Sequence, residues 1–324
     1  MKSPVPDALV PAVSALCDLA QQRIEKGEVF AAYRLLGPEL SRLIEAASAT
    51  GAEQNLVAQV RNHAVFGLCQ QDPYTARAYE KPRGYPGDAV MLDFVYSGRP
   101  PDGTSDLGRQ LFLATTRVPM GLSVLYRRSL LRAYIDDQVA RRPGCRILSV
   151  ASGHCREVEG SLLFRDGFDS EFIALDQDAE TAAVVAREYP HPRLRTMTGR
   201  VRDLVFGRLD IGEFDFIYSA GLYDYLPDAT AAQLTAQLVS MLTPDGRLLL
   251  ANFLPSCYGR GYLETFMDWR LKYRSPDELR ELFPEALRNF VQTTTDPHGN
   301  VVYAVLARPA PGATLGALQN FTFA

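Results

Sequence analysis

The residues best suited to chemistry lie in and after a glycine turn near the middle of the chain. The stretch that begins CRILSVASGHCREVEG at Cys145 predicts an apolar strand, a tight turn at Gly153 and a helix over 155–165. A second apolar strand ends at Asp176, roughly 20 residues after the turn. A carboxylate there can accept hydrogen bonds from both hydroxyls of a ribose. The unit is therefore typical of a nucleoside site.

The number of glycines in this turn limits which class of ligand it can bind. One glycine replaces the G-x-G-x-x-G pattern that lets backbone approach a pyrophosphate, so a dinucleotide is disfavoured. A nucleoside without phosphates fits better, and S-adenosylmethionine (SAM) is the common one. The N-terminus of the expected helix would attract the carboxylate of SAM. We expect Ser152 or His154 to add a hydrogen bond, and Gln177, beside Asp176, to line the same cofactor site.

A second acidic position follows the third expected strand, in the loop TGRVRD. Asp203 there can accept from the amino group of an adenine, with Val201 or Arg202 packed near the ring. The alternative is that Asp203 forms a surface ion pair with a nearby arginine.

The loop after the fourth expected strand, SAGLYDYLP, should face the reacting sulfonium, because ligands of open α/β sheets lie at the carboxyl ends of the strands. Tyrosine rings attract cations, and tyrosine or aspartate oxygens can orient or deprotonate a nucleophile. An aromatic loop of this kind is also often simply core. The expected cofactor contacts are Ser219, Ala220 and Gly221, and the expected catalytic residues are Tyr223, Asp224 and Tyr225.

Two further segments are unusual enough to predict a lid and an aromatic wall over the pocket. KPRGYPGD places Arg83 and Tyr85 on a rigid turn, and Tyr85 is a further catalytic candidate. RGYLETFMDWRLKYR follows the fifth strand and contributes Tyr262 and Trp269, while Asn252 lies at the end of that strand. The alternatives are an ordinary turn and an ordinary amphipathic helix.

The elements that must position these residues differ between the two halves of the chain. Residues 1–142 have helical periodicity throughout and predict an all-helical N-terminal domain. Its expected helices are 7–27, 28–49, 51–70, 73–80, 86–97 and 105–140.

Residues 143–324 alternate strands with helices and predict a Rossmann-like parallel sheet. The last two strands are too close for a helical crossover and must form an antiparallel hairpin, which is the layout of class I methyltransferases. The expected strands are 145–151, 171–175, 194–198, 214–219, 246–253, 288–295 and 300–307, and the helices between them, besides 155–165, are 179–188, 229–242 and 275–283.

The segments RGYPGD, VASGHCRE, YSAGLYDYLP and RGYLETFMDWRLKYR together resemble a bacterial subgroup of class I SAM-dependent methyltransferases with a helical N-terminal domain. The resemblance covers the chain from about residue 75 onward. It implies one of two activities: methylation of a hydroxy fatty acid carboxylate, or cyclisation of SAM to azetidine-2-carboxylate with release of methylthioadenosine. The first turn of that subgroup is usually richer in small residues, as in CGPAREV, where this chain has SGHCREV.

Composition sets the remaining expectations. The formal net charge is −4 with a pI near 5.7, which disfavours a nucleic-acid partner. We expect no membrane insertion, because no apolar run approaches the roughly 20 residues needed to cross a bilayer. The five scattered cysteines favour reduced thiols in a cytoplasm, and neither cysteine nor histidine spacing predicts a metal. The oligomeric state stays open.

Taken together, the sequence predicts an enzyme that acts on a small molecule by SN2 displacement at the sulfonium of SAM. Methyl transfer to a carboxylate or another small-metabolite nucleophile is the leading hypothesis. Cyclisation of SAM itself is the close alternative, and a SAM-binding protein without turnover is the minor one.

Overall fold

The computed structural model describes residues 9–308, which divide into two compact units. The helical unit consists of the described residues up to Leu125 together with Cys257–Arg270. The sheet unit consists of Tyr126–Ser256 and the described residues from Leu271 onward. The helical unit is therefore built from two separate stretches of sequence.

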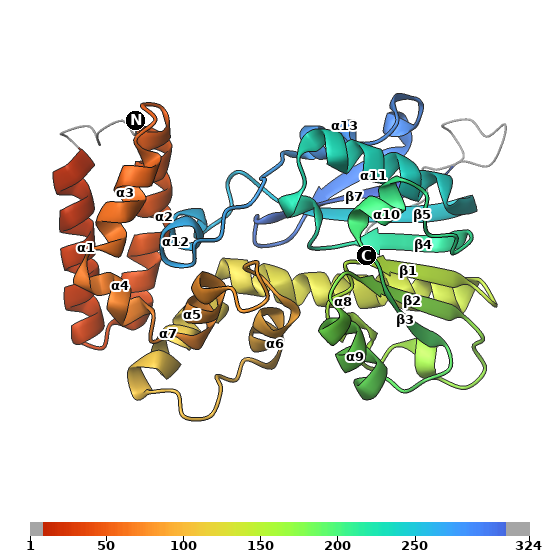
Figure 1. Cartoon of the computed structure of the whole chain (residues 1–324), viewed down its shortest axis with the longest axis horizontal. Coiled ribbons are helices and arrows are strands. Elements are labelled where there is room, and N and C mark those ends of the chain that lie inside the picture. Colours follow the sequence, from red (N-terminus) through yellow and green to blue (C-terminus); the bar gives the residue numbers. More distant parts are fainter. Residues whose placement is uncertain (1–8, 309–324) are drawn as a thin grey trace. The chain divides into compact units, whose positions relative to one another are not determined.

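The helical unit is all-α within the described residues (Figure 1). In α12, Gly261 allows a very close approach to α2, because a Cβ at this position would lie 2.2 Å from the backbone nitrogen of Ser41. The Gly261 N–H donates to Ser41 Oγ over 2.8 Å. The helices are α1 (Leu9–Glu25), α2 (Val29–Ser48), α3 (Glu53–Arg61), α4 (Ala64–Cys69), α5 (Pro73–Glu80), α6 (Ala89–Ser97), α7 (Asp106–Thr116), the beginning of α8 (Pro119–Arg141) and α12 (Arg260–Phe266).

Two long helices that the sequence predicted are each broken in two. The expected helix 51–70 is interrupted where His63 adopts extended backbone and caps α4 by accepting from the Val65 N–H. The expected helix 105–140 is interrupted before Pro119, because proline disfavours helical backbone in the residue that precedes it. Residues 7 and 8 of the first expected helix lie outside the described residues.

The sheet unit contains a seven-stranded sheet in the order β3-β2-β1-β4-β5-β7-β6. β1 to β5 are parallel, while β7 runs antiparallel to both β5 and β6. This confirms the predicted Rossmann-like sheet with a terminal hairpin, which is the methyltransferase fold. The strands are β1 (Arg146–Val150), β2 (Glu171–Asp176), β3 (Leu194–Thr198), β4 (Phe214–Ser219), β5 (Leu242–Phe253), β6 (Val291–Thr295) and β7 (Val301–Ala307).

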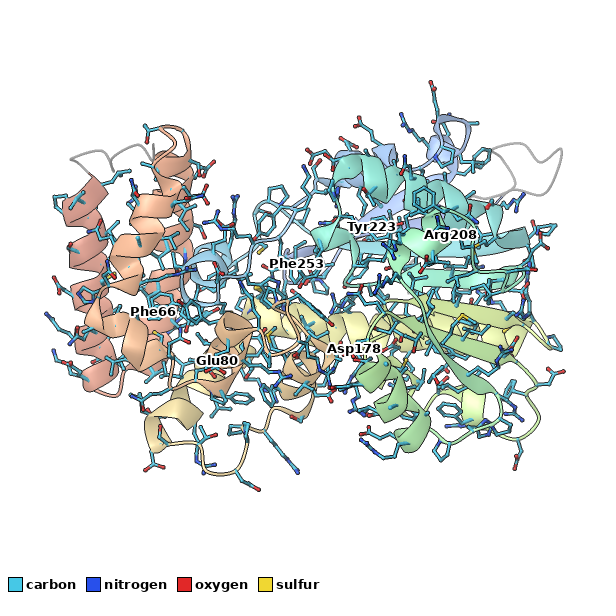
Figure 2. All side chains as sticks on the ribbon, viewed as in Figure 1. Phe66, Glu80, Asp178, Arg208, Tyr223 and Phe253 are labelled. Atoms are coloured by element: carbon cyan, nitrogen blue, oxygen red, sulfur yellow. The ribbon has the colours of Figure 1, made fainter. Side chains whose placement is uncertain are left out.

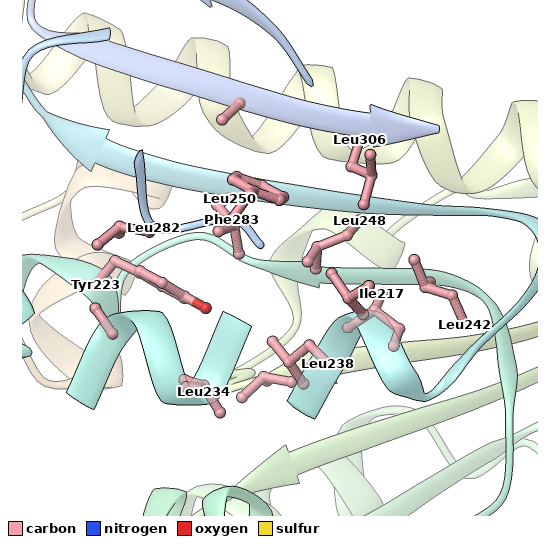
Figure 3. Close-up of a cluster of buried hydrophobic side chains, with 14 of the residues drawn as sticks. Ile217, Tyr223, Leu234, Leu238, Leu242, Leu248, Leu250, Leu282, Phe283 and Leu306 are labelled. Atoms are coloured by element: carbon pink, nitrogen blue, oxygen red, sulfur yellow. The ribbon is translucent and has the colours of Figure 1, made fainter. Parts of the chain in front are cut away.

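Helices cover both faces of this sheet, because successive strand residues point to opposite sides. Phe216 of β4 stacks on Tyr134 of α8, with ring centroids 5.8 Å apart. Its neighbour Ile217 packs on the other face in a buried cluster with Leu234 and Leu238 of α11 (Figure 3). The helices of the sheet unit besides α8 are α9 (Ala179–Glu188), α10 (Val201–Val205), α11 (Asp228–Ser240) and α13 (Pro276–Glu281).

The predicted α-helix over 155–165 is wrong. Two three-residue 3-10 helices, Arg156–Val158 and Leu162–Phe164, occupy this segment. Cys155 has left-handed backbone with φ of 52°, and Gly160 has φ of 72°, so neither position continues a right-handed helix. The strand expected over 288–295 also starts late, because Glu285–Phe290 forms a 3-10 helix and β6 begins at Val291.

Among residues 9–308, no helix combines the length and the apolar character needed to cross a bilayer.

Candidate functional site

The turn after β1 has unusual backbone geometry. Ala151, Gly153 and Cys155 have φ of 55°, 55° and 52°, so three residues within five are left-handed. For alanine and cysteine this conformation costs about 1–2 kcal/mol, since Cβ crowds the carbonyl oxygen. Backbone strain of this kind is concentrated at ligand sites. The partial charge of a following α-helix, which we expected to bind the carboxylate of SAM, is absent here.

Asp176 closes this turn. Its Oδ2 accepts from the Gly153 N–H over 2.9 Å, and its Oδ1 accepts from the Asp178 N–H over 3.0 Å. Burial raises the pKa of the Asp176 carboxyl above its ordinary value, and these two N–H groups partly offset that rise. Each carboxylate oxygen retains acceptor capacity for a ribose hydroxyl. Asp178 is the N-cap of α9, where Figure 2 labels it, and the neighbouring Gln177 is exposed.

This turn lies where the strand order reverses. β1 has β2 on one side and β4 on the other, so the chain switches direction across the sheet at this point. Open α/β sheets bind ligands in the crevice that such a switch creates. The ends of the strands are joined there, because Ser219 Oγ of β4 donates to the Val150 carbonyl of β1 over 3.0 Å.

The predicted adenine contacts lie in α10, which follows β3. The Gly199 N–H, just after β3, donates to the Asp176 carbonyl over 2.9 Å, which joins this loop to the end of β2. Asp203 in α10 is half-buried and lies 3.7 Å from Arg208 Nη1, while Arg202 is exposed. Asp203 thus has the arginine partner that the alternative interpretation expected.

A buried arginine that the sequence analysis missed reaches the loop after β4. Arg127 of α8 is 5% exposed, and its Nη1 donates to the Ala220 carbonyl, beside Gly221. The signal was present in the sequence, because Val124, Arg127, Leu131 and Ile135 repeat at helical spacing and are all buried. An arginine on an apolar stripe must find polar partners inside the protein.

Arg127 interacts electrostatically with two buried acids. Glu157, which follows the β1 turn, accepts a hydrogen bond from the Tyr218 hydroxyl of β4. Burial raises the pKa of Glu157, and Arg127 partly offsets the rise. Burial likewise raises the pKa of Asp224 to about 6, again with Arg127 opposing. The Arg127 guanidinium therefore favours the charged form of two carboxyl groups, one from each side of the switch point.

The aromatic loop divides into buried and accessible parts. Tyr223 is fully buried in the apolar cluster, and its hydroxyl lies 2.9 Å from Thr235 Oγ1 (Figures 2 and 3). Asp224 Oδ1 accepts from the Phe253 N–H over 2.7 Å and so attaches the loop to the end of β5. Tyr225 is 37% exposed. The positions of Tyr223 and Asp224 fit the core alternative, and Tyr225 is the more accessible of the two tyrosines.

Arg274 fixes the shape of this loop. It is 1% exposed and donates through Nη1 to the Tyr223 carbonyl and to Asn252 Oδ1, over 2.7 and 2.6 Å. Its Nη2 donates to the Leu226 carbonyl over 2.6 Å. Asn252 Nδ2 donates in turn to the Lys272 carbonyl over 2.8 Å. The YDYLP and DWRLKYR segments of the sequence are therefore directly bonded, and Asn252 is part of that structural network.

The remaining predicted site residues belong to the helical unit. Arg83 and Tyr85 are half-buried on the RGYPGD turn, whose Asp88 caps α6 and pairs with Arg77 over 2.6 Å. Tyr262 is 1% exposed, and its hydroxyl lies 3.1 Å from Thr75 Oγ1.

Trp269 of the same unit is 5% exposed. Its backbone N–H donates to the Leu263 carbonyl over 2.9 Å.

Within residues 9–308, no three His, Cys, Asp or Glu side chains are grouped so that they could hold a metal ion.

No protein-family model matches the chain, and no curated protein matches it. A solved structure described as a possible exported protein from Bordetella parapertussis is similar, with a TM-score of 0.58 and 17% identity over 75% of this chain and 95% of that one. Magnesium protoporphyrin IX methyltransferase from Synechocystis, solved with bound SAH, matches with a TM-score of 0.48 and 13% identity over 72% of this chain and 97% of that one. The N-methyltransferase NodS from Bradyrhizobium japonicum matches with a TM-score of 0.41 and 12% identity over 59% and 98%. At 17% identity, the first similarity shows the fold alone.

Proposed function

We propose that this chain is a SAM-dependent enzyme that transfers a methyl group to a small-molecule nucleophile such as a carboxylate. The observation that supports the proposal is the bond between the Asp176 carboxylate and the Gly153 N–H, at the point where the strand order reverses. This bond aligns a carboxylate with a glycine turn, which is the arrangement that a ribose requires.

The residues around the turn fit SAM. Its two ribose hydroxyls match the two oxygens of Asp176, each of which accepts one backbone N–H and can accept again. SAM carries two positive groups, an ammonium and a sulfonium, and one negative carboxylate. The acids Glu157 and Asp224 lie around the switch point, and both interact electrostatically with Arg127. When bound, SAM supplies an electrophilic carbon on a cationic sulfur, which a nucleophile can attack in line.

The chain's own residues then have separable roles. Asp176 would hold the ribose, and Asp203 would accept from the adenine amino group at the cost of its contact with Arg208. Arg127 holds the Ala220 carbonyl in place beside the reaction centre. Tyr225 is the hydroxyl of the aromatic loop best placed to orient an incoming nucleophile, because Tyr223 is committed to the core.

We further propose, from the resemblance of the RGYPGD and RGYLETFMDWRLKYR segments, that Arg83, Tyr85 and Trp269 contribute to ligand binding. The half-buried state of Arg83 and Tyr85 is compatible with this role. Tyr262 is better explained as core of the helical unit, since it packs against Phe266 with ring centroids 4.7 Å apart. Substitutions Arg83→Gln and Tyr85→Phe should raise KM for SAM, and unchanged kinetics would remove both residues from the site.

Product analysis tests the reaction. The full-length protein is incubated with SAM, with and without a panel of hydroxy fatty acids and other small carboxylates, and the products are identified by mass spectrometry. S-adenosylhomocysteine that appears only with an acceptor supports methyl transfer. Methylthioadenosine and azetidine-2-carboxylate formed from SAM alone would show that the reaction is cyclisation of SAM and not methyl transfer. Binding without either product would leave a SAM-binding protein.

Asp176→Ala tests the ribose site, with Asp178→Ala as the matched control. The first change removes the carboxylate at the switch point, and we expect SAM affinity to fall by about 1–3 kcal/mol. The second removes the N-cap of α9 and its bond from the Thr181 hydroxyl, so stability should drop by about 1 kcal/mol with SAM affinity unchanged. Isothermal titration calorimetry measures both. Equal affinity for the wild type and Asp176→Ala would contradict this placement of the ribose.

A further inference from the structure

A cavity lined by charged residues lies at the opposite edge of the sheet from Gly153 and Asp176. It has a volume of about 280 Å³ and is formed where α8 ends, where β5 begins and where the chain leaves β7. Arg247 of β5 stands beside Ala307 in the antiparallel register of β7. The polar residues that line it are Gln138, Arg141, Arg142, Asp245, Arg247 and Arg308.

Positive charge exceeds negative charge around this cavity. Four arginines and one aspartate line it, in a chain whose formal net charge is −4. Asp137 is shared between Arg141 and Arg247, at 2.6 and 3.1 Å. Arg142 pairs with Asp215 over 2.7 Å. Even with Asp137 and Asp215 included, four cations face three anions.

Arg308 contributes the excess charge. Its Nη1 donates to the Leu242 carbonyl, and within residues 9–308 it forms no ion pair. Arg247 is 12% exposed, and its pKa is lowered first by burial and also by repulsion from Arg141. An anion in the cavity would relieve that repulsion and give Arg308 a counter-charge.

From this geometry we propose that the cavity binds a small phosphate-bearing anion. Guanidinium groups match phosphate oxygens with paired N–H donors, and several converging arginines suit a dianion better than a single carboxylate. The volume accommodates a free phosphate or a small phosphomonoester and falls below that of a drug-sized ligand pocket. A nucleic acid would need an extended basic surface, whereas the arginines here form one local cluster in an acidic chain.

The cavity is separate from the proposed SAM site. Arg127 and Arg141 both belong to α8, and the rise of 1.5 Å per residue puts their Cα atoms about 21 Å apart. Occupation of one site therefore leaves the other open, and anion binding in the cavity does not depend on whether the chain uses SAM.

Calorimetric titration of the full-length protein tests the proposal, using inorganic phosphate, glycerol phosphate and sulfate, with chloride at equal ionic strength as the reference. The wild type should bind phosphate with Kd below about 1 mM. Arg141→Gln/Arg308→Gln should weaken binding at least tenfold. Tighter binding of glycerol phosphate than of phosphate would identify a phosphomonoester, and the reverse order would identify the free ion.

The matched control is Arg187→Gln/Arg195→Gln, which removes the same charge from side chains that are 70% and 59% exposed outside the cavity. It should bind phosphate like the wild type. Unfolding midpoints in chloride show whether each variant is folded. If the double cavity variant does not fold, Arg141→Gln alone, at a 60% exposed side chain, should weaken binding about threefold or more. No phosphate binding by the wild type, or equal binding by the cavity variants and the control, would overturn the proposal.

Discussion

Arg274 Nη1 lies 2.7 Å from the backbone carbonyl oxygen of Tyr223, so a residue 51 positions later in the chain determines the shape of the aromatic loop. The same guanidinium also donates to the Leu226 carbonyl, to Asn252 and to Asp228. This side chain, which is 1% exposed, thus gives several backbone and side-chain acceptors the hydrogen bonds that water would otherwise supply.

Loss of this arginine should be severe. We expect Arg274→Met to lower the free energy of unfolding by about 3–5 kcal/mol, because it leaves buried acceptors without donors. Arg274→Lys should recover only part of the loss, since an ammonium cannot reproduce the planar fork. Urea denaturation followed by circular dichroism gives these values. Arg280→Lys, at a more exposed arginine of α13, is the control and should change stability by less than about 0.5 kcal/mol.

Tyr223→Phe separates a core role from a catalytic one. Removal of the hydroxyl breaks its bond to Thr235, and we expect a loss of about 1 kcal/mol in stability with kcat unchanged. Thr235→Val should cost a similar amount, and the double variant should lose less than the sum. Tyr225→Phe, at the accessible tyrosine, should instead reduce kcat. A large fall in kcat for Tyr223→Phe at wild-type stability would return Tyr223 to the reaction centre.

Asp72 should give the helical unit a pH-dependent stability. Burial raises the pKa of its carboxyl from 3.8 to about 6, although Thr75, Thr115 and the Tyr74 N–H donate to it. The folded state therefore holds this proton more tightly than the unfolded chain. The resulting stabilisation is complete below about pH 4 and is lost as the pH rises through about 6.

The comparison with Asp72→Asn isolates this effect, because asparagine does not titrate. Between pH 4 and 7 the wild type should lose up to about 3 kcal/mol relative to the variant. Urea denaturation at pH 4.5, 5.5 and 7 measures the difference. Asp277→Asn, at a side chain that is 83% exposed, is the control for the same exchange at the surface. A difference between wild type and Asp72→Asn that is constant with pH would contradict the prediction.

The left-handed turn after β1 offers a pair of opposite substitutions. Ala151→Gly should stabilise the protein by up to about 1 kcal/mol, because glycine adopts a φ of 55° without steric cost. Gly153→Ala should destabilise the protein by about 1 kcal/mol, because alanine adopts a φ of 55° only with strain. It should also weaken SAM binding, since the residue 153 N–H donates to the Asp176 carboxylate. Thermal unfolding and calorimetry measure the two effects. Equal stability of both variants would show that the turn carries no backbone strain.

Local patterns predicted the sheet well. Apolar strands separated by helices implied parallel pairing of the strands. The short connection from Thr295 to Val301 left no room for a crossover, so the hairpin was predictable. The place of Asp176 at the end of β2 was predictable for the same reason, because it ends an apolar strand, while its role at a ribose stays a prediction.

Residues whose environment depends on distant segments could not be predicted in this way. The segment after Cys155 has helical composition, yet left-handed backbone and the tie of Ser161 to Asp136 of α8 divide it into short turns. The burial of the Tyr223 side chain depends on packing against α11, and the position of its backbone carbonyl depends on a hydrogen bond from Arg274. Arg127 was visible as an arginine on an apolar stripe, but only the tertiary structure supplies its partners.

The division of the helical unit between two stretches of sequence has a consequence for its synthesis. Tyr262 and Phe266, both buried in that unit, emerge from the ribosome long after α1 to α7. Between Leu125 and Cys257 lie 131 residues of the sheet unit, which take roughly 7–26 s to translate at 5–20 residues per second. Until Cys257–Arg270 has been made, the nascent helices lack part of their apolar interior, so the helical unit cannot complete its core before the sheet unit is largely synthesised.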